Sequence, residues 1–174
     1  MKITKLDLGD TLHGYGAQLG PGWTSVDLDP RREDEPPEPD KLIADYAALP
    51  FKDAAFDFLY GGCWLEMDMG LGCEAGDVEG NPEKEDIILR ARFKEAARVL
   101  KVGGRMKISS CSGYGDLKET RVFERHVASI AAEFGLIQRS PAKHDVQEYD
   151  DTCEGVAEHH MDVYYGMQNF IRTR

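Results

Sequence analysis

Residues 5–13, KLDLGDTLH, decide the fold of this chain. They form a short apolar strand that stops at Gly9 and leads into a turn. A second strand, WTSVDLD at residues 23–29, ends in acids. A strand, a glycine turn and a second strand that ends in acid are typical of the first half of a nucleotide-binding sheet. We therefore predict an α/β fold built on parallel strands.

Strands and helices alternate along the rest of the chain. Helices are predicted over residues 82–100, stopped by Gly103-Gly104, and over residues 118–134. The predicted strands are residues 2–8, 23–28, 41–44, 55–60, 105–111, one that starts at Leu136, and 161–171. No helix separates the last two strands, so we expect them to pair antiparallel. The predicted fold class is a Rossmann-like, doubly wound, mostly parallel sheet of about seven strands that ends in an antiparallel hairpin.

Three segments contain too many glycines, prolines or charges for regular structure. Residues 9–22 leave room for at most a turn or two of helix. Residues 30–40 (PRREDEPPEPD) read as a solvated loop. Residues 61–82 are predicted to form a mobile loop segment over the active face. The whole chain, residues 1–174, is expected to fold as a single domain.

Composition limits the partners of the chain. Asp and Glu total 32 against 21 Lys and Arg, so the net charge is −11. That sign repels phosphate backbones, so we expect no nucleic-acid partner. No membrane span or signal peptide is predicted, which favours the cytoplasm. No Cys-x-x-Cys motif occurs, and the adjacent His159 and His160 would point to opposite faces of a strand, so no metal site is predicted.

Two further segments extend the pattern of the opening strands. Residues 44–51 (ADYAALPF) precede FDFLY at residues 56–60, and residues 93–105 read FKEAARVLKVGGR. In this order and spacing, the chain resembles the class I S-adenosylmethionine-dependent methyltransferases. The resemblance implies transfer of a methyl group from S-adenosylmethionine to a small-molecule acceptor or one of a cell-envelope or glycan type. The nucleic-acid-methylating motif Asn/Asp-Pro-Pro-aromatic is absent after the fourth strand, at residues 61–66.

The resemblance also implies which residues bind the cofactor. Gly9 lets the backbone approach a ligand closely because it has no Cβ. Asp27, or alternatively Asp29, accepts the ribose hydroxyls, and Asp45 accepts the adenine amino group. An Asx-turn is the alternative role for Asp45. The full predicted set is Asp7, Gly9, Asp10, Asp27, Leu28, Asp45, Tyr46 and Gly61, with Tyr46 flanking the adenine ring; no catalytic residue is assigned.

The glycine turn departs from the family pattern. Thr11 and His13 stand where the family has glycine, which makes a catalytically inactive binding module the alternative function. A carboxylate at Asp10 would repel the pyrophosphate of a dinucleotide. S-adenosylmethionine has no phosphate and carries a sulfonium and an ammonium. The turn therefore favours this cofactor over a nicotinamide or flavin.

Overall fold

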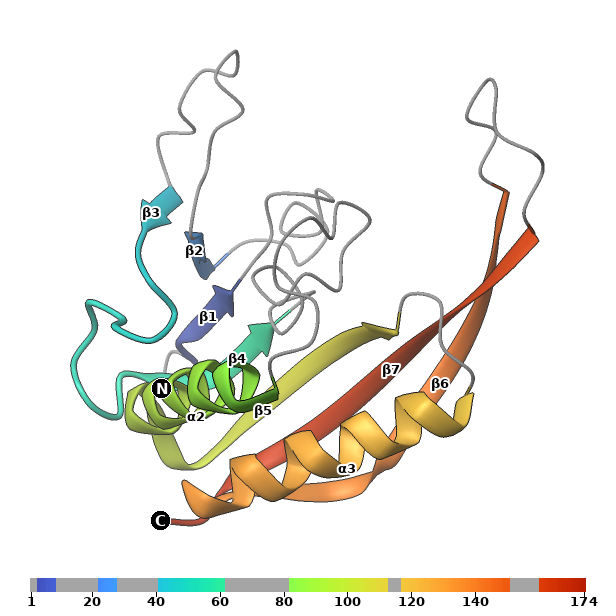
Figure 1. Ribbon diagram of the computed structural model, residues 1–174. Helices are drawn as coiled ribbons and strands as arrows, with labels where there is room; N and C mark the ends of the chain where they lie inside the picture. The colour runs from blue at the N-terminus through green and yellow to red at the C-terminus, as the bar shows by residue number, and fades with distance from the viewer. Residues whose placement is uncertain (1–2, 9–21, 28–40, 62–81, 113–116, 151–159) are drawn as a thin grey trace.

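The computed structural model describes residues 3–8, 22–27, 41–61, 82–112, 117–150 and 160–174 (Figure 1). In chain order the elements are β1 (Lys5–Leu8), β2 (Trp23–Asp27), β3 (Lys41–Ile43), β4 (Phe56–Gly61), α2 (Pro82–Val99), β5 (Leu100–Ser112), α3 (Leu117–Glu133), β6 (Leu136–Asp150) and β7 (His160–Arg172). The predicted mobile loop lies outside the described residues except for its ends.

The strands form one seven-stranded sheet in the order β3-β2-β1-β4-β5-β7-β6. The first five strands of this order pair in parallel, and β7 runs antiparallel to both β5 and β6. The predicted mostly parallel sheet with a closing antiparallel hairpin is confirmed. Both described helices, α2 and α3, lie on one face of this sheet (Figure 1). The segments that follow β1 and β2 lie outside the described residues.

The helix-covered face of the sheet is the core. Strand residues alternate between faces, and register pairs such as Leu6 with Leu59, or Leu59 with Met106, bring apolar residues onto the same face. The buried residues of this face, all at most 1% exposed, are Leu6, Leu8, Val26, Leu59, Met106, Ile108 and Phe170. Phe170 of β7 meets Phe93 of α2 with ring centroids 6.2 Å apart. Burial of this apolar layer is the main force that holds the helices on the sheet.

The opposite face carries larger and more polar side chains. Trp23 of β2 meets Phe58 of β4 edge to face at 5.6 Å and Tyr60 at 6.4 Å. The ammonium of Lys5 lies 5.3 Å from the Trp23 ring centroid, which is within the range of a cation–π contact. These side chains are half-buried, so the faces of this sheet differ in character.

The junction between α2 and β5 corrects the sequence prediction. The helix ends at Val99 rather than Leu100, and β5 starts at once instead of at residue 105. Gly103 adopts a φ of 82°, and the register of β5 on β4 shifts between Leu100 and Arg105. The glycines therefore form an irregularity inside the strand rather than a helix stop. Arg172 of β7 donates to the carbonyls of Arg98, in the last turn of the helix, and Leu100, the first residue of β5.

A charged network joins Thr4, the residue before β1, to β4 and β5 at the amino end of the sheet. The carboxylate of Asp57 in β4 accepts hydrogen bonds from the Thr4 backbone amide at 2.9 Å and the Thr4 hydroxyl at 2.8 Å. Its other oxygen lies 2.8 Å from the Lys101 ammonium of β5. The hydrogen bond from Lys101, followed by those from Thr4, lowers the pKa of Asp57 from 3.8 to about 2. The network therefore depends on the ionised carboxylate.

This network makes a prediction about acid stability. Because the pKa of Asp57 is depressed in the folded state, its stabilising contribution is present above about pH 4 and is lost as the pH falls towards 2. Asp57→Asn should lower the free energy of unfolding at pH 7 and reduce its loss between about pH 4 and 2. Urea unfolding at several pH values measures both effects. Lys101→Met should reproduce part of the change, and an unaltered pH dependence in Asp57→Asn would contradict the assignment.

Candidate functional site

Three predicted site residues that the structure describes, Asp27, Asp45 and Gly61, lie at or just beyond the carboxyl ends of parallel strands. Leu8, the last residue of β1, pairs with Val26 of β2 and with Gly61 of β4. Asp27, one residue beyond Val26, pairs with Ile43 at the end of β3. Segments far apart in the chain therefore end side by side, as the sequence predicted for a ligand site.

The strand order places the centre of this edge between β1 and β4. The chain proceeds from β1 outward to β2 and β3, then returns to β4 on the other side of β1. In open α/β sheets, ligands bind outside the carboxyl ends of the strands at such a reversal. Gly61 lies at this point, buried between Leu8 and Ile108 of β5. Gly9, Asp10 and Leu28 lie outside the described residues, as do Thr11 and His13.

Asp7 is buried within β1 rather than exposed at the edge. Its side chain is 1% exposed, and its register partners are Ser25 of β2 and Tyr60 of β4. It therefore belongs to the face that carries Trp23, opposite the helices. Its role in cofactor binding stays a prediction.

Asp45 follows β3 and forms the Asx-turn that the sequence left as its alternative role. One oxygen, Oδ1, accepts a hydrogen bond from the Ala47 amide at 2.8 Å. The backbone carbonyl accepts another from the Ala48 amide at 2.9 Å. The side chain is exposed, and Oδ2 accepts no hydrogen bond from a described residue. The turn therefore holds the carboxylate in place while one oxygen faces solvent.

Tyr46 lies in the core. Its side chain has no exposed surface, and the Arg92 guanidinium of α2 lies 5.3 Å from its ring centroid. Arg92 is itself 2% exposed. This packing covers the Tyr46 ring, and its contact with an adenine stays a prediction.

The sequence analysis did not identify the residue that holds the loop after β3, residues 44–55. Arg98, in the last turn of α2, donates to the carbonyls of Leu49 at 2.8 Å and Phe51 at 2.7 Å. Its guanidinium also contacts Glu95 at 2.7 Å and Asp53 at 2.8 Å. Glu95 in turn accepts a hydrogen bond from the Leu49 amide at 3.0 Å. We call these two helix residues the Glu95–Arg98 clamp.

The clamp is electrostatically strong. Hydrogen bonds from Arg98 hold the pKa of Glu95 below its usual value, and Glu95, then Asp53, raises that of Arg98. Both clamp residues therefore stay charged across the physiological range. The sequence signal for the clamp is the pair of motifs Glu95-x-x-Arg98 and Leu49-Pro50-Phe51. Both motifs entered only as part of the resemblance to the class I methyltransferases.

Among the described residues, no group of three or more His, Cys, Asp or Glu side chains could hold a metal ion. Neither α2 nor α3 has the length and apolar content needed to cross a bilayer.

Comparison with solved structures identifies the fold. A SAM-dependent methyltransferase from Methanosarcina mazei matches with a TM-score of 0.59 and 11% identity, covering 100% of this chain and 95% of that one. The fold is that of the class I methyltransferases. Geranyl diphosphate C-methyltransferase from Streptomyces coelicolor, solved with S-adenosyl-L-homocysteine, matches at 0.55 and 13% over 99% and 74%. A 16S rRNA adenine methyltransferase from Catenulisporales acidiphilia, solved with SAM, matches at 0.56 and 11% over 99% and 87%.

Sequence comparison adds no closer relative. No protein-family model matches the chain, and no curated protein matches it significantly. At these identities the structural likeness establishes the shared fold.

The clamp predicts a specific loss of stability. Arg98→Lys keeps the charge but loses the planar fork that reaches two carbonyls and two carboxylates. We expect it to lower the free energy of unfolding by roughly 2 kcal/mol, because half-buried carbonyls lose their donors. Urea denaturation measures this. Arg105→Lys, at an exposed position of β5, is the matched control and should change stability by less than about 0.5 kcal/mol; equal effects would argue against the clamp.

Proposed function

We propose that this chain transfers the methyl group of S-adenosylmethionine to an acceptor that is a small molecule or a cell-envelope or glycan-type group. One observation carries the proposal: acids stand at the carboxyl ends of β2 and β3, beside the reversal of strand order between β1 and β4. The shared fold with SAM-dependent methyltransferases supports it. We further propose that the protein acts in the cytoplasm.

The residues present fit this cofactor in charge and in hydrogen-bonding capacity. The exposed Asp45 Oδ2 is an acceptor suited to the adenine amino group, and Asp27 is suited to the ribose hydroxyls. A chain of net charge −11 attracts a ligand that carries a sulfonium and an ammonium. Asp10, beside Gly9 in the sequence, adds a carboxylate suited to the ammonium.

When bound, S-adenosylmethionine supplies an electrophilic methyl group. The chain's own contribution is to bind and orient the adenosyl end, so that an acceptor attacks in line; proximity of this kind supplies much of a rate enhancement. Asp45 is held in place for this task by its Asx-turn, and the loop behind it by the Glu95–Arg98 clamp. No described residue is assigned as a general base.

The proposal is tested by calorimetry with S-adenosylmethionine and S-adenosylhomocysteine. We expect saturable binding, and Asp27→Ala should weaken it by about tenfold to a hundredfold, because two hydrogen bonds to a carboxylate are lost. Glu133→Gln, at the far end of α3, is the control and should bind like the wild type. Absence of binding at millimolar ligand in the folded protein would sink the proposal and favour a non-catalytic module.

Asp45 can be tested apart from its turn. Asp45→Asn keeps an oxygen that can accept the Ala47 amide, so the free energy of unfolding should stay close to that of the wild type. The loss of the carboxylate should nevertheless weaken cofactor binding by about tenfold. Asp45→Ala should lower both quantities. If Asp45→Asn binds the cofactor as tightly as the wild type, the carboxylate serves only the turn.

A further inference from the structure

Arg92 of α2 is a buried cation to which the proposed chemistry gives no role. Its side chain is 2% exposed, and its helix neighbours Leu89 and Phe93 belong to the hydrophobic core. Removing a guanidinium from water is costly, so a buried arginine needs contacts that an apolar side chain would not supply. One of its contacts is with the loop after β3, because the guanidinium carbon lies 5.3 Å from the centroid of the Tyr46 ring.

Tyr46 is the central residue of the turn that presents Asp45. The Asp45 carboxylate accepts from the Ala47 amide and the Asp45 carbonyl from the Ala48 amide, so both hydrogen bonds close around Tyr46. The Tyr46 side chain has no exposed surface. In a close-packed interior, the backbone of such a residue cannot rotate without moving the side chain against its neighbours. The contact with Arg92 therefore anchors the turn to α2.

Arg92 extends the row of α2 residues that hold this loop. Arg92, Glu95 and Arg98 follow one another at intervals of three, and this spacing places them on one side of the helix. Glu95 accepts from the Leu49 amide and Arg98 donates to the Leu49 carbonyl, whereas Arg92 covers the Tyr46 ring. The loop is thus attached to α2 at two points, at Tyr46 by Arg92 and at Leu49 by the Glu95–Arg98 clamp.

From this arrangement we infer that Arg92 is a positioning residue for adenine recognition. Through the Tyr46 ring it fixes the turn, and the turn fixes the direction of the Asp45 carboxylate. A preorganised acceptor discriminates more sharply between ligand groups that can and cannot donate to it. Because this role rests on the proposed function, in which Asp45 accepts the adenine amino group, Arg92 contributes to the preference for adenine over a base that lacks that group.

Calorimetry with two ligands tests this role in the full chain. S-inosylhomocysteine differs from S-adenosylhomocysteine in having an oxygen where the adenine carries its amino group. The wild type should bind S-adenosylhomocysteine about tenfold more tightly, because only its amino group can donate to Asp45. The ratio of the two dissociation constants is the quantity to follow, since a general loss of binding leaves it unchanged.

Arg92→Lys keeps the positive charge but loses the planar guanidinium that lies over the Tyr46 ring. It should weaken the binding of S-adenosylhomocysteine by about fivefold and leave S-inosylhomocysteine nearly unchanged, so that the preference falls to about twofold. Arg92→Met, which also removes the charge, should lower the preference at least as much. Circular dichroism verifies that each variant is folded, and either folded variant suffices for the test.

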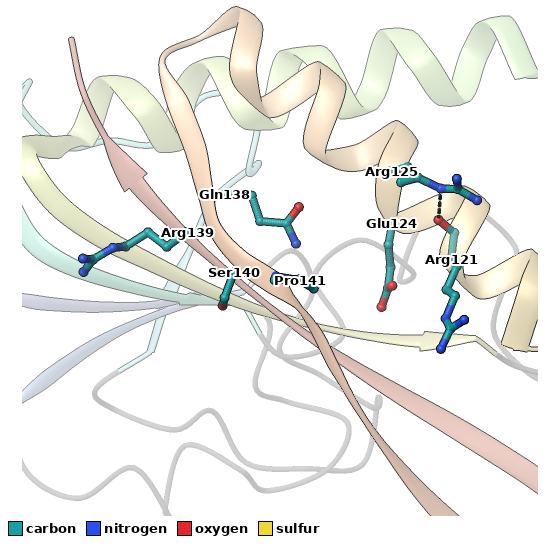
Figure 2. Close-up of a pocket in the computed structure, with 7 residues that line it drawn as sticks. All are labelled: Arg121, Glu124, Arg125, Gln138, Arg139, Ser140 and Pro141. Atoms are coloured by element: carbon teal, nitrogen blue, oxygen red, sulfur yellow. Dashed lines mark hydrogen bonds between the residues drawn. The ribbon is translucent and has the colours of Figure 1, made fainter.

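A double-mutant cycle with Asp45→Asn separates positioning from a general structural effect. If Arg92 acts through the Asp45 carboxylate, Arg92→Lys should not change the preference further once that carboxylate is gone. Two controls alter an arginine away from the loop. Arg90→Lys changes the same helix where it meets Glu133 of α3. Arg125→Lys changes the lining of a pocket of about 680 Å³ between α3 and β6 (Figure 2). Both should keep the preference of the wild type.

The outcomes separate this role from the proposed function. Equal weakening of both ligands by Arg92→Lys and Arg92→Met would overturn the role of Arg92 and leave cofactor binding in place. The same holds if the Arg90→Lys control loses the preference as well, or if Arg92→Lys lowers it equally in the Asp45→Asn background. A wild type that binds both ligands equally would overturn adenine recognition by Asp45, and with it the role of Arg92. A wild type that binds neither ligand would overturn both proposals.

Discussion

The Glu95–Arg98 clamp is the interaction on which the candidate site depends. Residues 44–55 contain no strand or helix, so their backbone groups have no ladder of partners. The clamp supplies those partners from α2: it accepts from the Leu49 amide and donates to the Leu49 and Phe51 carbonyls. The Ala54 amide donates to the Arg98 carbonyl in addition. The loop that starts at Asp45 is therefore positioned by the helix, and the helix is positioned by the core.

The arrangement of the sheet places the candidate site at the carboxyl edge of the parallel strands. The apolar face packs against α2 and α3, and its buried residues form the core. β1 and β4 lie at the centre of the parallel part and end together, which makes their carboxyl edge the place where backbone and polar groups converge. Asp27 stands at this edge because it ends β2, and Asp45 because it lies two residues beyond the end of β3. The same topology leaves β6 at the far edge, where α3 covers it only in part.

Alternation of apolar residues made the fold predictable, whereas contacts across the chain limited prediction of the site. The β1 and β2 strands, the closing hairpin and both helices follow from local pattern. Gly103-Gly104 read as a helix stop, but they lie inside β5, between Leu100 and Arg105, which both pair with β4. The burial of Tyr46 depends on Arg92, and the clamp on Arg98, which lie far along the chain.

The net charge of the chain bears on the proposed cofactor site. The net charge of −11 acts over a Debye length, about 8 Å at physiological salt, and favours a cationic ligand approaching from any direction. Added salt would screen this long-range attraction first, because short contacts with partly desolvated groups are screened less. The acidic surface therefore assists the approach of the proposed cofactor, whereas the contacts at Asp27 and Asp45 would decide how tightly it is held.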